Sequence, residues 1–192
     1  RHLIAHIEIL GSAFFNDTAT AEIYTLALHD ALPIWTEIVL CNGLFVPDMG
    51  AERGKGADMR RTLYHLLVSG DRMKRPEDTI VVFLDTDVLT QYFGTHFVFG
   101  LAGAVLEGHD FAKASFWRGM GRVKKFVAQP LFSSIDHPSL RGLSSLAYPL
   151  SGEVAGTLEF FTRVSFWQMY GVETGINIDT CFADYQIGRA HV

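Results

Sequence analysis

The stretch TIVVFLDTD, residues 79–87, decides the fold class. Its first six residues form an unbroken β-branched and apolar run, typical of a strand buried on both faces of a parallel sheet. Open α/β sheets bind ligands beyond the carboxyl ends of their strands, so Asp85 and Asp87 would face such a crevice. Carboxylate oxygens at this spacing suit Mg²⁺ or Mn²⁺, which would neutralise a diphosphate. The alternative is a solvated turn that carries two acids.

Helical and extended patterns alternate on both sides of this strand. Strands are predicted over 37–41 and 111–117, where short apolar runs are bounded by turn residues. Helices are predicted over 57–68, 97–106 and 123–135, the third interrupted by Pro130, and a last helix from about 171 through 181. The alternation predicts an α/β sheet covered by helices.

The composition fits one globular domain. The 192 residues are 48% hydrophobic and 19% charged, which is enough to bury a core. The net charge of −5 gives no reason to expect nucleic acid or an anionic membrane as a partner. Two cysteines are too few for a disulfide framework, and no apolar run approaches the roughly 20 residues of a membrane span. We therefore expect a cytoplasmic protein.

Both ends of the chain resemble translated sequencing adapter. The stretch 16–34, NDTATAEIYTLALHDALPI, differs from the translation of a common short-read adapter only at Ala21 and Ala27. The tail 186–192, QIGRAHV, contains the translated start of the opposite adapter. We predict that 1–34 and 186–192 are not native and that native sequence runs from 35 to 185. The alternative is a natural amphipathic segment at the N-terminus.

A cationic, glycine-containing stretch opens the helix before residue 79. In RGKG, residues 53–56, small residues let backbone N–H groups approach a phosphate at a helix N-terminus, and Lys55 adds a charge. The stretch is not a P-loop, because Gly56 follows Lys55. The alternative is a flexible surface loop.

A second cationic stretch, RGMGRVKK, occupies residues 118–125. It presents Gly121, Arg122 and Lys124 at the start of a helix, where like charges are unfavourable unless an anion binds. Backbone N–H groups and a guanidinium fork suit a phosphorylated or carboxylated substrate. A solvated helix start is the alternative.

Two glutamates lie in glycine-flanked, largely apolar surroundings. Glu153 ends the stretch YPLSGE, and Glu173 lies within YGVETG. An unpaired charge in such a place is costly, so each acid should pair with a cation, a metal or a substrate hydroxyl. For Glu153 a helix-capping role is the alternative.

Over about residues 48–180 the chain resembles the glucosyl-3-phosphoglycerate synthase family. The resemblance rests on six segments in the family's order and near its spacing: RGKG, IVVFLDTD, GLAGAVL, GRVKKFVAQPL, YPLSGEVAG and YGVETGINIDT. It implies an α/β fold of the GT-A type, with 35–185 as a partial glycosyltransferase domain. The family's N-terminal nucleotide-binding strand and its PxxNE and DxGSxD segments are absent, so the nucleotide-binding half is expected to be missing.

The same resemblance assigns the donor residues. It implies that Lys55 binds the diphosphate of a nucleotide sugar, and that Asp87 binds the metal with the assistance of Asp85. Glu173 would be the catalytic residue, in contact with the transferred sugar or the acceptor. The family also completes its metal site with a downstream histidine, for which this chain offers only His191, inside the adapter-like tail.

The acceptor residues follow from the second cationic stretch. The resemblance implies that Gly121 and Arg122 hold the phosphate or carboxylate of the acceptor, with Lys124 beside them. Lys124 stands where the family usually has threonine, and the loop before Gly121 is shorter than in the family.

The implied function is retaining transfer of a sugar, glucose from UDP-glucose, to 3-phosphoglycerate or a similar small acid, with Mg²⁺ or Mn²⁺ as cofactor. The expected partners are this donor, this acceptor and a second copy of the chain in a homodimer. A sugar-phosphate nucleotidylyltransferase is the first alternative, although RGKG is a poor triphosphate cradle. An inactive, non-enzymatic piece is the second, and we expect this exact chain to be inactive.

Overall fold

A computed structural model describes residues 6–12, 44–47, 49–68, 75–85, 88, 91–116 and 121–191. The strand predicted over 37–41 and the adapter-like stretch 16–34 lie outside these residues, as does Asp87.

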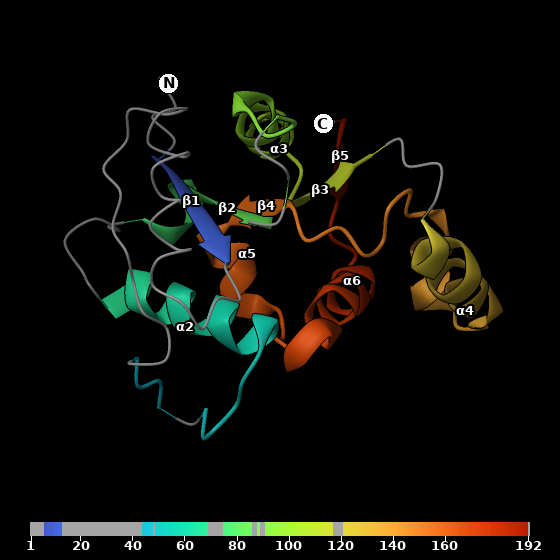
Figure 1. The fold of residues 1–192 in the computed structure, drawn as a ribbon, viewed down its shortest axis with the longest axis horizontal. Helices are drawn as coiled ribbons and strands as arrows, with labels where there is room; N and C mark the ends of the chain where they lie inside the picture. The colour runs from blue at the N-terminus through green and yellow to red at the C-terminus, as the bar shows by residue number, and fades with distance from the viewer. Residues whose placement is uncertain are drawn as a thin grey trace.

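The described chain is built on a mixed five-stranded sheet of order β1-β2-β4-β3-β5 (Figure 1). Its strands are β1 (His6–Ser12), β2 (Thr79–Asp85), β3 (Phe111–Ser115), β4 (Val154–Thr157) and β5 (Ile187–His191). β1 pairs with β2 and β3 with β5 in parallel, whereas β4 is antiparallel to both of its neighbours. The prediction of a parallel sheet is therefore wrong at β4. The chain leaves β3 and re-enters β4 at the same end of the sheet, so this connection does not cross the sheet as a parallel crossover would.

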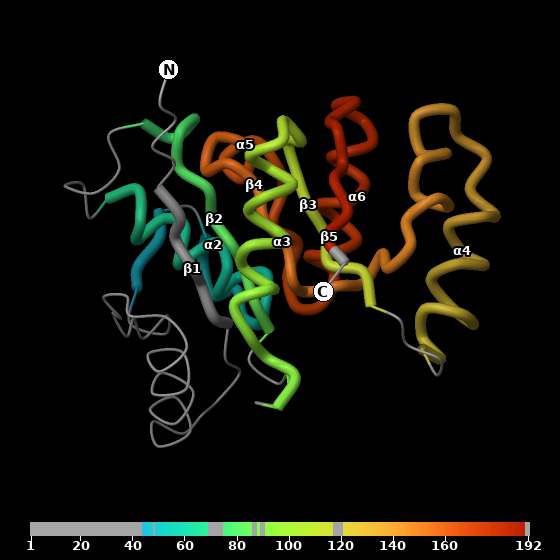
Figure 2. Tube along the Cα trace, turned by 90° about the horizontal axis from the view of Figure 1, so that it is seen from above, coloured from blue at the N-terminus to red at the C-terminus, as the bar shows by residue number. Residues whose placement is uncertain are grey.

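Helices cover both faces of the sheet (Figure 2). On one face, α3 (Thr95–Leu106) packs on the even-numbered residues of β2: Ile80, Val82 and Leu84. On the other face, α2 (Lys55–Val68), α5 (Leu158–Arg163) and α6 (Val172–Phe182) pack on Val81 and Phe83. Alternate residues of a strand point to opposite faces, so one run of apolar residues supplies both cores, as predicted for a strand buried on both sides. Within the described residues, no helix has the length and apolarity needed to cross a membrane.

A helical arm lies at the edge of the molecule, and α6 lies between this arm and β2 in both views (Figures 1 and 2). It comprises a π-helical turn, η3 (Lys124–Ala128), then α4 (Gln129–Ser134) and the 3₁₀ helix η4 (Pro138–Ser145). Pro130 cannot donate a backbone hydrogen bond, and the bonding changes just before it, where Gln129 N–H donates to Lys124 O. The predicted interruption at Pro130 is thus a change of helix type rather than an end.

Two strands come from segments expected to be non-native. Residues His6–Ser12 of the N-terminal segment form β1, which pairs with β2 along all seven of its residues. At the other end, Ile187–His191 of the adapter-like tail pairs with β3 as β5. That residues 1–34 and 186–192 are not native sequence stays a prediction.

Candidate active site

The carboxyl end of β2 delivers Asp85 to one face of the sheet. Strand alternation places Asp85 on the same side as Val81 and Phe83, which is the face covered by α2 and α6. The first residue of α2 is Lys55, and Glu173 lies in the first turn of α6. One edge of the sheet and the N-termini of two helices therefore meet at one place.

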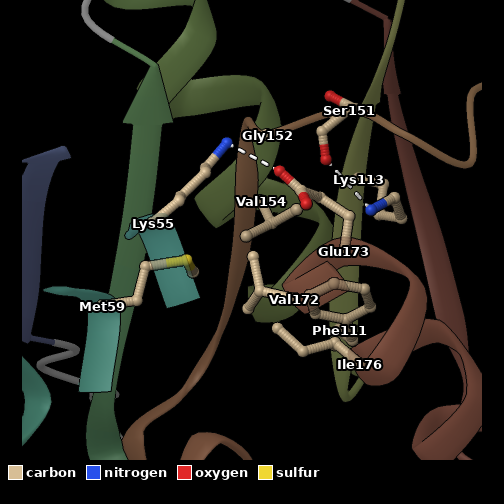
Figure 3. A pocket seen from close by; sticks show the side chains of 10 residues that line it. All are labelled: Lys55, Met59, Phe111, Lys113, Ser151, Gly152, Val154, Val172, Glu173 and Ile176. Atoms are coloured by element: carbon tan, nitrogen blue, oxygen red, sulfur yellow. Dashed lines mark hydrogen bonds and ion pairs between the residues drawn. The ribbon is translucent and has the colours of Figure 1, made fainter. Parts of the chain in front are cut away.

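Lys55 joins the three elements through two short ion pairs. Its Nζ lies 2.6 Å from Asp85 Oδ1 and 2.8 Å from Glu173 Oε1. Figure 3 shows the Lys55 ammonium pointing at the Glu173 carboxylate. The Lys55 side chain is only 6% exposed and that of Glu173 11%, whereas Asp85 keeps 29% of its side chain exposed. The alternative of a flexible surface loop is therefore wrong at Lys55, which is buried in α2. The alternative of a solvated turn with two acids is not tested, because Asp87 lies outside the described residues.

Opposing charges keep the Lys55 ammonium protonated. Burial alone would lower the pKa of Lys55, but the carboxylates of Asp85 and Glu173 outweigh it and raise the pKa. A cation at the first turn of α2 is unfavourable to the helix dipole, whereas Glu173 in the first turn of α6 is favourable. The two acids thus offset both the burial of the ammonium and its place in α2.

Gly152 allows the backbone to approach this ion pair. A Cβ atom built there would lie 2.1 Å from Asp85 Oδ2 and 2.2 Å from Lys55 Nζ, closer than any side chain tolerates. The segment that leads into β4 therefore forms one wall of the site, and any larger residue at this position would have to displace the ends of the Asp85 and Lys55 side chains. Sequence reasoning named the motif YPLSGEVAG but did not find this role.

Glu153 is buried beside the same wall. It is 6% exposed, and its Oε2 accepts a hydrogen bond of 2.7 Å from Ser151 Oγ. Burial raises the pKa of Glu153, with the charge of Asp85 adding to the effect. The helix-capping alternative is wrong, because β4 follows Glu153 and the cap of α5 is Thr157, whose Oγ1 accepts from Phe160 N.

Lys113, in β3, is a site residue that sequence reasoning missed. It is 5% exposed, lines the same pocket as Lys55 and Glu173, and donates a 3.1 Å hydrogen bond to Ser151 O. Its Nζ also lies 5.5 Å from the centre of the Phe111 ring. Burial lowers the pKa of Lys113 to about 8. The available signal was alternation, because a lysine two residues after Phe111 shares that residue's inward face.

The three predicted acceptor residues lie at the start of the helical arm. Arg122 is exposed, Gly121 O accepts from Lys125 N at 2.9 Å, and Lys124 Nζ lies 5.1 Å from the centre of the Tyr148 ring. None of these three lines the pocket that holds Lys55 and Glu173. The structure thus brings Lys55, Asp85 and Glu173 together and leaves the acceptor residues apart, so their role stays a prediction.

The predicted metal site is only partly described. Asp85 offers a half-buried carboxylate at the end of a strand, and hard oxygen of this kind suits Mg²⁺ or Mn²⁺. Its predicted partner Asp87 lies outside the described residues, which contain no group of three or more metal-ligating side chains. The backbone of His191 pairs with Ser115 at the end of β5, and its side chain is not described.

In sequence, the chain is similar to curated glucosyl-3-phosphoglycerate synthases. No family model matches the chain. The glucosyl-3-phosphoglycerate synthase of Petrotoga mobilis is 35% identical over 147 residues, which is 70% of this chain and 40% of the relative. The enzyme of the same name from Mycobacterium tuberculosis strain H37Rv is 34% identical over 151 residues, 70% of this chain and 42% of the relative. The chain thus spans about two fifths of the curated relatives it matches.

Solved structures agree with this result. The glucosyl-3-phosphoglycerate synthase of Mycobacterium tuberculosis in complex with Mn²⁺, UDP-glucose and phosphoglyceric acid superposes with a TM-score of 0.74 at 26% identity. The match covers 97% of this chain and 70% of that one. A complex of the same enzyme with Mg²⁺ and UDP gives a TM-score of 0.73 at 26% identity, covering 97% and 69%.

The fold is therefore that of the GT-A nucleotide-sugar transferases, in a truncated form. Over about 70% of its length, the chain's resemblance to the glucosyl-3-phosphoglycerate synthase family is confirmed. The ions in the solved relatives, Mn²⁺ and Mg²⁺, are the two that the sequence predicted.

Proposed function

We propose that the chain is the catalytic part of a retaining glycosyltransferase that moves glucose from UDP-glucose to 3-phosphoglycerate or a similar small acid. The observation that carries this proposal is the buried Lys55 ammonium, held between Asp85 and Glu173 at the sheet edge where α/β folds bind ligands. The relatives supply the substrates, since one of their structures holds UDP-glucose together with phosphoglyceric acid.

In this proposal the donor diphosphate lies against Lys55. A Mg²⁺ or Mn²⁺ ion held by Asp87 and Asp85 would supply further neutralisation of the departing diphosphate. Glu173 orients the Lys55 ammonium through their ion pair and faces the transferred sugar. Catalysis then rests on positioning and on fixed charges rather than on a covalent intermediate.

The acceptor would be held by Gly121, Arg122 and Lys124. The exposed guanidinium of Arg122 at the start of the helical arm suits a phosphate or carboxylate. Acceptors in the solved relatives are phosphoglyceric acid and glycerol 3-phosphate, and both carry a phosphate. We propose a small phosphorylated acid as the acceptor of this chain, a homodimer as its assembly and the cytoplasm as its location.

No observation favours the nucleotidylyltransferase over the transferase. A nucleotidylyltransferase needs a triphosphate cradle, whereas the N-terminus of α2 presents one lysine already paired with two acids. The relatives described above are named as synthases. Loss of activity in this exact chain stays our prediction, because the family's PxxNE and DxGSxD segments are not in it.

The test is transfer of radiolabel from UDP-glucose to 3-phosphoglycerate in the presence of Mg²⁺, on this chain and on a full-length relative. The relative should form labelled product, and replacement of its residue matching Asp87 by alanine should abolish metal-dependent turnover. Unchanged turnover in that variant would contradict the metal role of Asp87. Release of diphosphate from a nucleoside triphosphate and a sugar phosphate would instead support the nucleotidylyltransferase.

A further inference from the structure

Glu173 faces a second buried cation besides Lys55. In Figure 3 its carboxylate lies between the ammonium groups of Lys55 and Lys113, and Glu173 exerts the largest charge effect on Lys113. Glu173 forms an ion pair with Lys55 at 2.8 Å but none with Lys113, although all three line one pocket. Glu173 and Lys113 therefore present a hydrogen-bond acceptor and a hydrogen-bond donor to the same pocket.

Lys113 has more hydrogen-bond donors than it has acceptors among the described residues. An ammonium carries three N–H groups, and among the described residues only Ser151 O accepts a hydrogen bond from Lys113. The side chain is 5% exposed, so bulk water is a poor substitute for the missing acceptors. A buried donor without an acceptor is costly, which points to a ligand that supplies one.

A sugar hydroxyl has the complementary chemistry, because its oxygen accepts a hydrogen bond while its proton is donated. We infer that Lys113 is a sugar-recognition residue: it donates to one hydroxyl of the transferred sugar, and Glu173 accepts from the same hydroxyl. This inference rests on the proposed function, since the diphosphate at Lys55 places the sugar beside Glu173. Lys113 thereby selects a donor that carries a hydroxyl at that ring position.

The surroundings of Lys113 favour a functional charge over a structural one. Four charged groups influence the pKa of Lys113: Glu173 from α6, Lys55 from α2, Asp85 from β2, and Glu153 from the segment before β4. None of them forms an ion pair with Lys113. Burial outweighs the acids and lowers the pKa of Lys113, so this ammonium costs stability in the absence of a ligand.

The test compares UDP-glucose with UDP, each with Mg²⁺, by ligand-observed NMR at millimolar concentration on the full chain. Wild type should bind UDP-glucose more tightly than UDP. In Lys113→Met the ratio of the dissociation constants of UDP and UDP-glucose should fall about tenfold, which corresponds to the loss of one hydrogen bond to a charged group. Methionine keeps the length of the apolar stem without the ammonium, and circular dichroism checks that the variant folds. A preference retained by Lys113→Met would overturn the inference.

The matched control is Asn177→Ala. Asn177 Nδ2 donates to Pro149 O at 2.7 Å, so Asn177 anchors the segment that Lys113 also anchors at Ser151, but it does not line the pocket. Asn177→Ala should keep the preference for UDP-glucose. Loss of the preference in both variants would show that the position of this segment matters rather than a sugar contact, and would overturn the inference.

Deoxy analogues of UDP-glucose test the inference without any variant. Removal of one particular hydroxyl should weaken binding to wild type about tenfold more than it weakens binding to Lys113→Met, because the variant has only the hydrogen bond to Glu173 left to lose. If every deoxy analogue binds wild type as UDP-glucose does, the inference fails while the proposed function stands. If neither wild type nor a full-length relative binds UDP or UDP-glucose, the proposed function fails as well.

Discussion

Lys113 places a positive charge inside the sheet, and its titration should be visible in stability. Burial lowers the pKa of Lys113 to about 8 from its ordinary 10.5, so between these values the unfolded chain binds more protons than the folded one. Stability should therefore rise with pH through this window, by up to about 3 kcal/mol. Urea unfolding at pH 7.5 and pH 10 measures the change.

Lys113→Met is the control for this pH dependence. The variant should lack the rise and should be at least as stable as wild type at pH 7.5, because a buried charge is replaced by an apolar side chain. An equal rise in wild type and variant would assign the effect to another group.

Gly152 tests how tightly the wall of the site is packed. Gly152→Ala should destabilise the fold by about 1–3 kcal/mol, since the new methyl group must displace the Lys55–Asp85 ion pair. Gly103→Ala is the matched control, because it meets nothing within 4 Å inside α3 and should be neutral or stabilising by up to about 1 kcal/mol. Equal melting temperatures for the two variants would contradict the close approach at Gly152.

At the scale of elements, the segment around Trp167 ties α2 to α6. A Cβ atom at Gly56 in α2 would lie 1.8 Å from Trp167 O, and one at Gly175 in α6 would lie 2.8 Å from the Trp167 ring. Gly56 was expected to make room for a phosphate, and in the structure it makes room for a backbone carbonyl. Because Lys55 and Glu173 are neighbours of these glycines in sequence, docking of Trp167 sets the distance between them.

We therefore predict that Gly56→Ala is more harmful than an ordinary helical substitution. A backbone oxygen cannot move aside as a flexible side chain can, so the loss should be about 3 kcal/mol or more. Hydrogen exchange should also quicken over 165–171, where the segment would undock. Unchanged exchange in this variant would show that the contact with Trp167 is not needed.

The helices and strands that the sequence predicted are those long enough to show a hydrophobic period or an apolar run. The helices α2, α3 and α6 and the strands β2 and β3 lie where periodicity or an apolar run placed them. β4 and α5 were missed because four and six residues are too short to show a period. The resemblance assigned Lys55, Asp85 and Glu173 to one site, but their ion pairs, like the contacts of Lys113 and Gly152, are visible only in the packed sheet.

At the scale of the whole molecule, both ends supply strands to the sheet although both were expected to be non-native. Parallel pairing satisfies backbone groups whatever the side chains are, so β1 and β5 do not decide the origin of their sequence. We predict that the source DNA, resequenced with a different library chemistry, will not contain the segments encoding 16–34 and 186–192. Their reappearance would show that they are native.

We predict that this chain binds the nucleotide part of the donor only weakly. In the proposed function Lys55 and Asp85 hold a diphosphate with its metal, but the chain lacks the PxxNE and DxGSxD segments that the family resemblance associates with the nucleotide. Calorimetric titration of UDP with Mg²⁺ should therefore show no binding tighter than about millimolar, roughly 4 kcal/mol.

A full-length relative titrated in the same way is the control and should bind more tightly, because it contains both segments. Micromolar binding by this chain that disappears on His191→Ala would overturn the prediction. It would mean that β5, which sets the backbone of His191 beside Ser115, completes a working metal site. The tail 186–192 would then be functional sequence, and its likeness to adapter would be a coincidence.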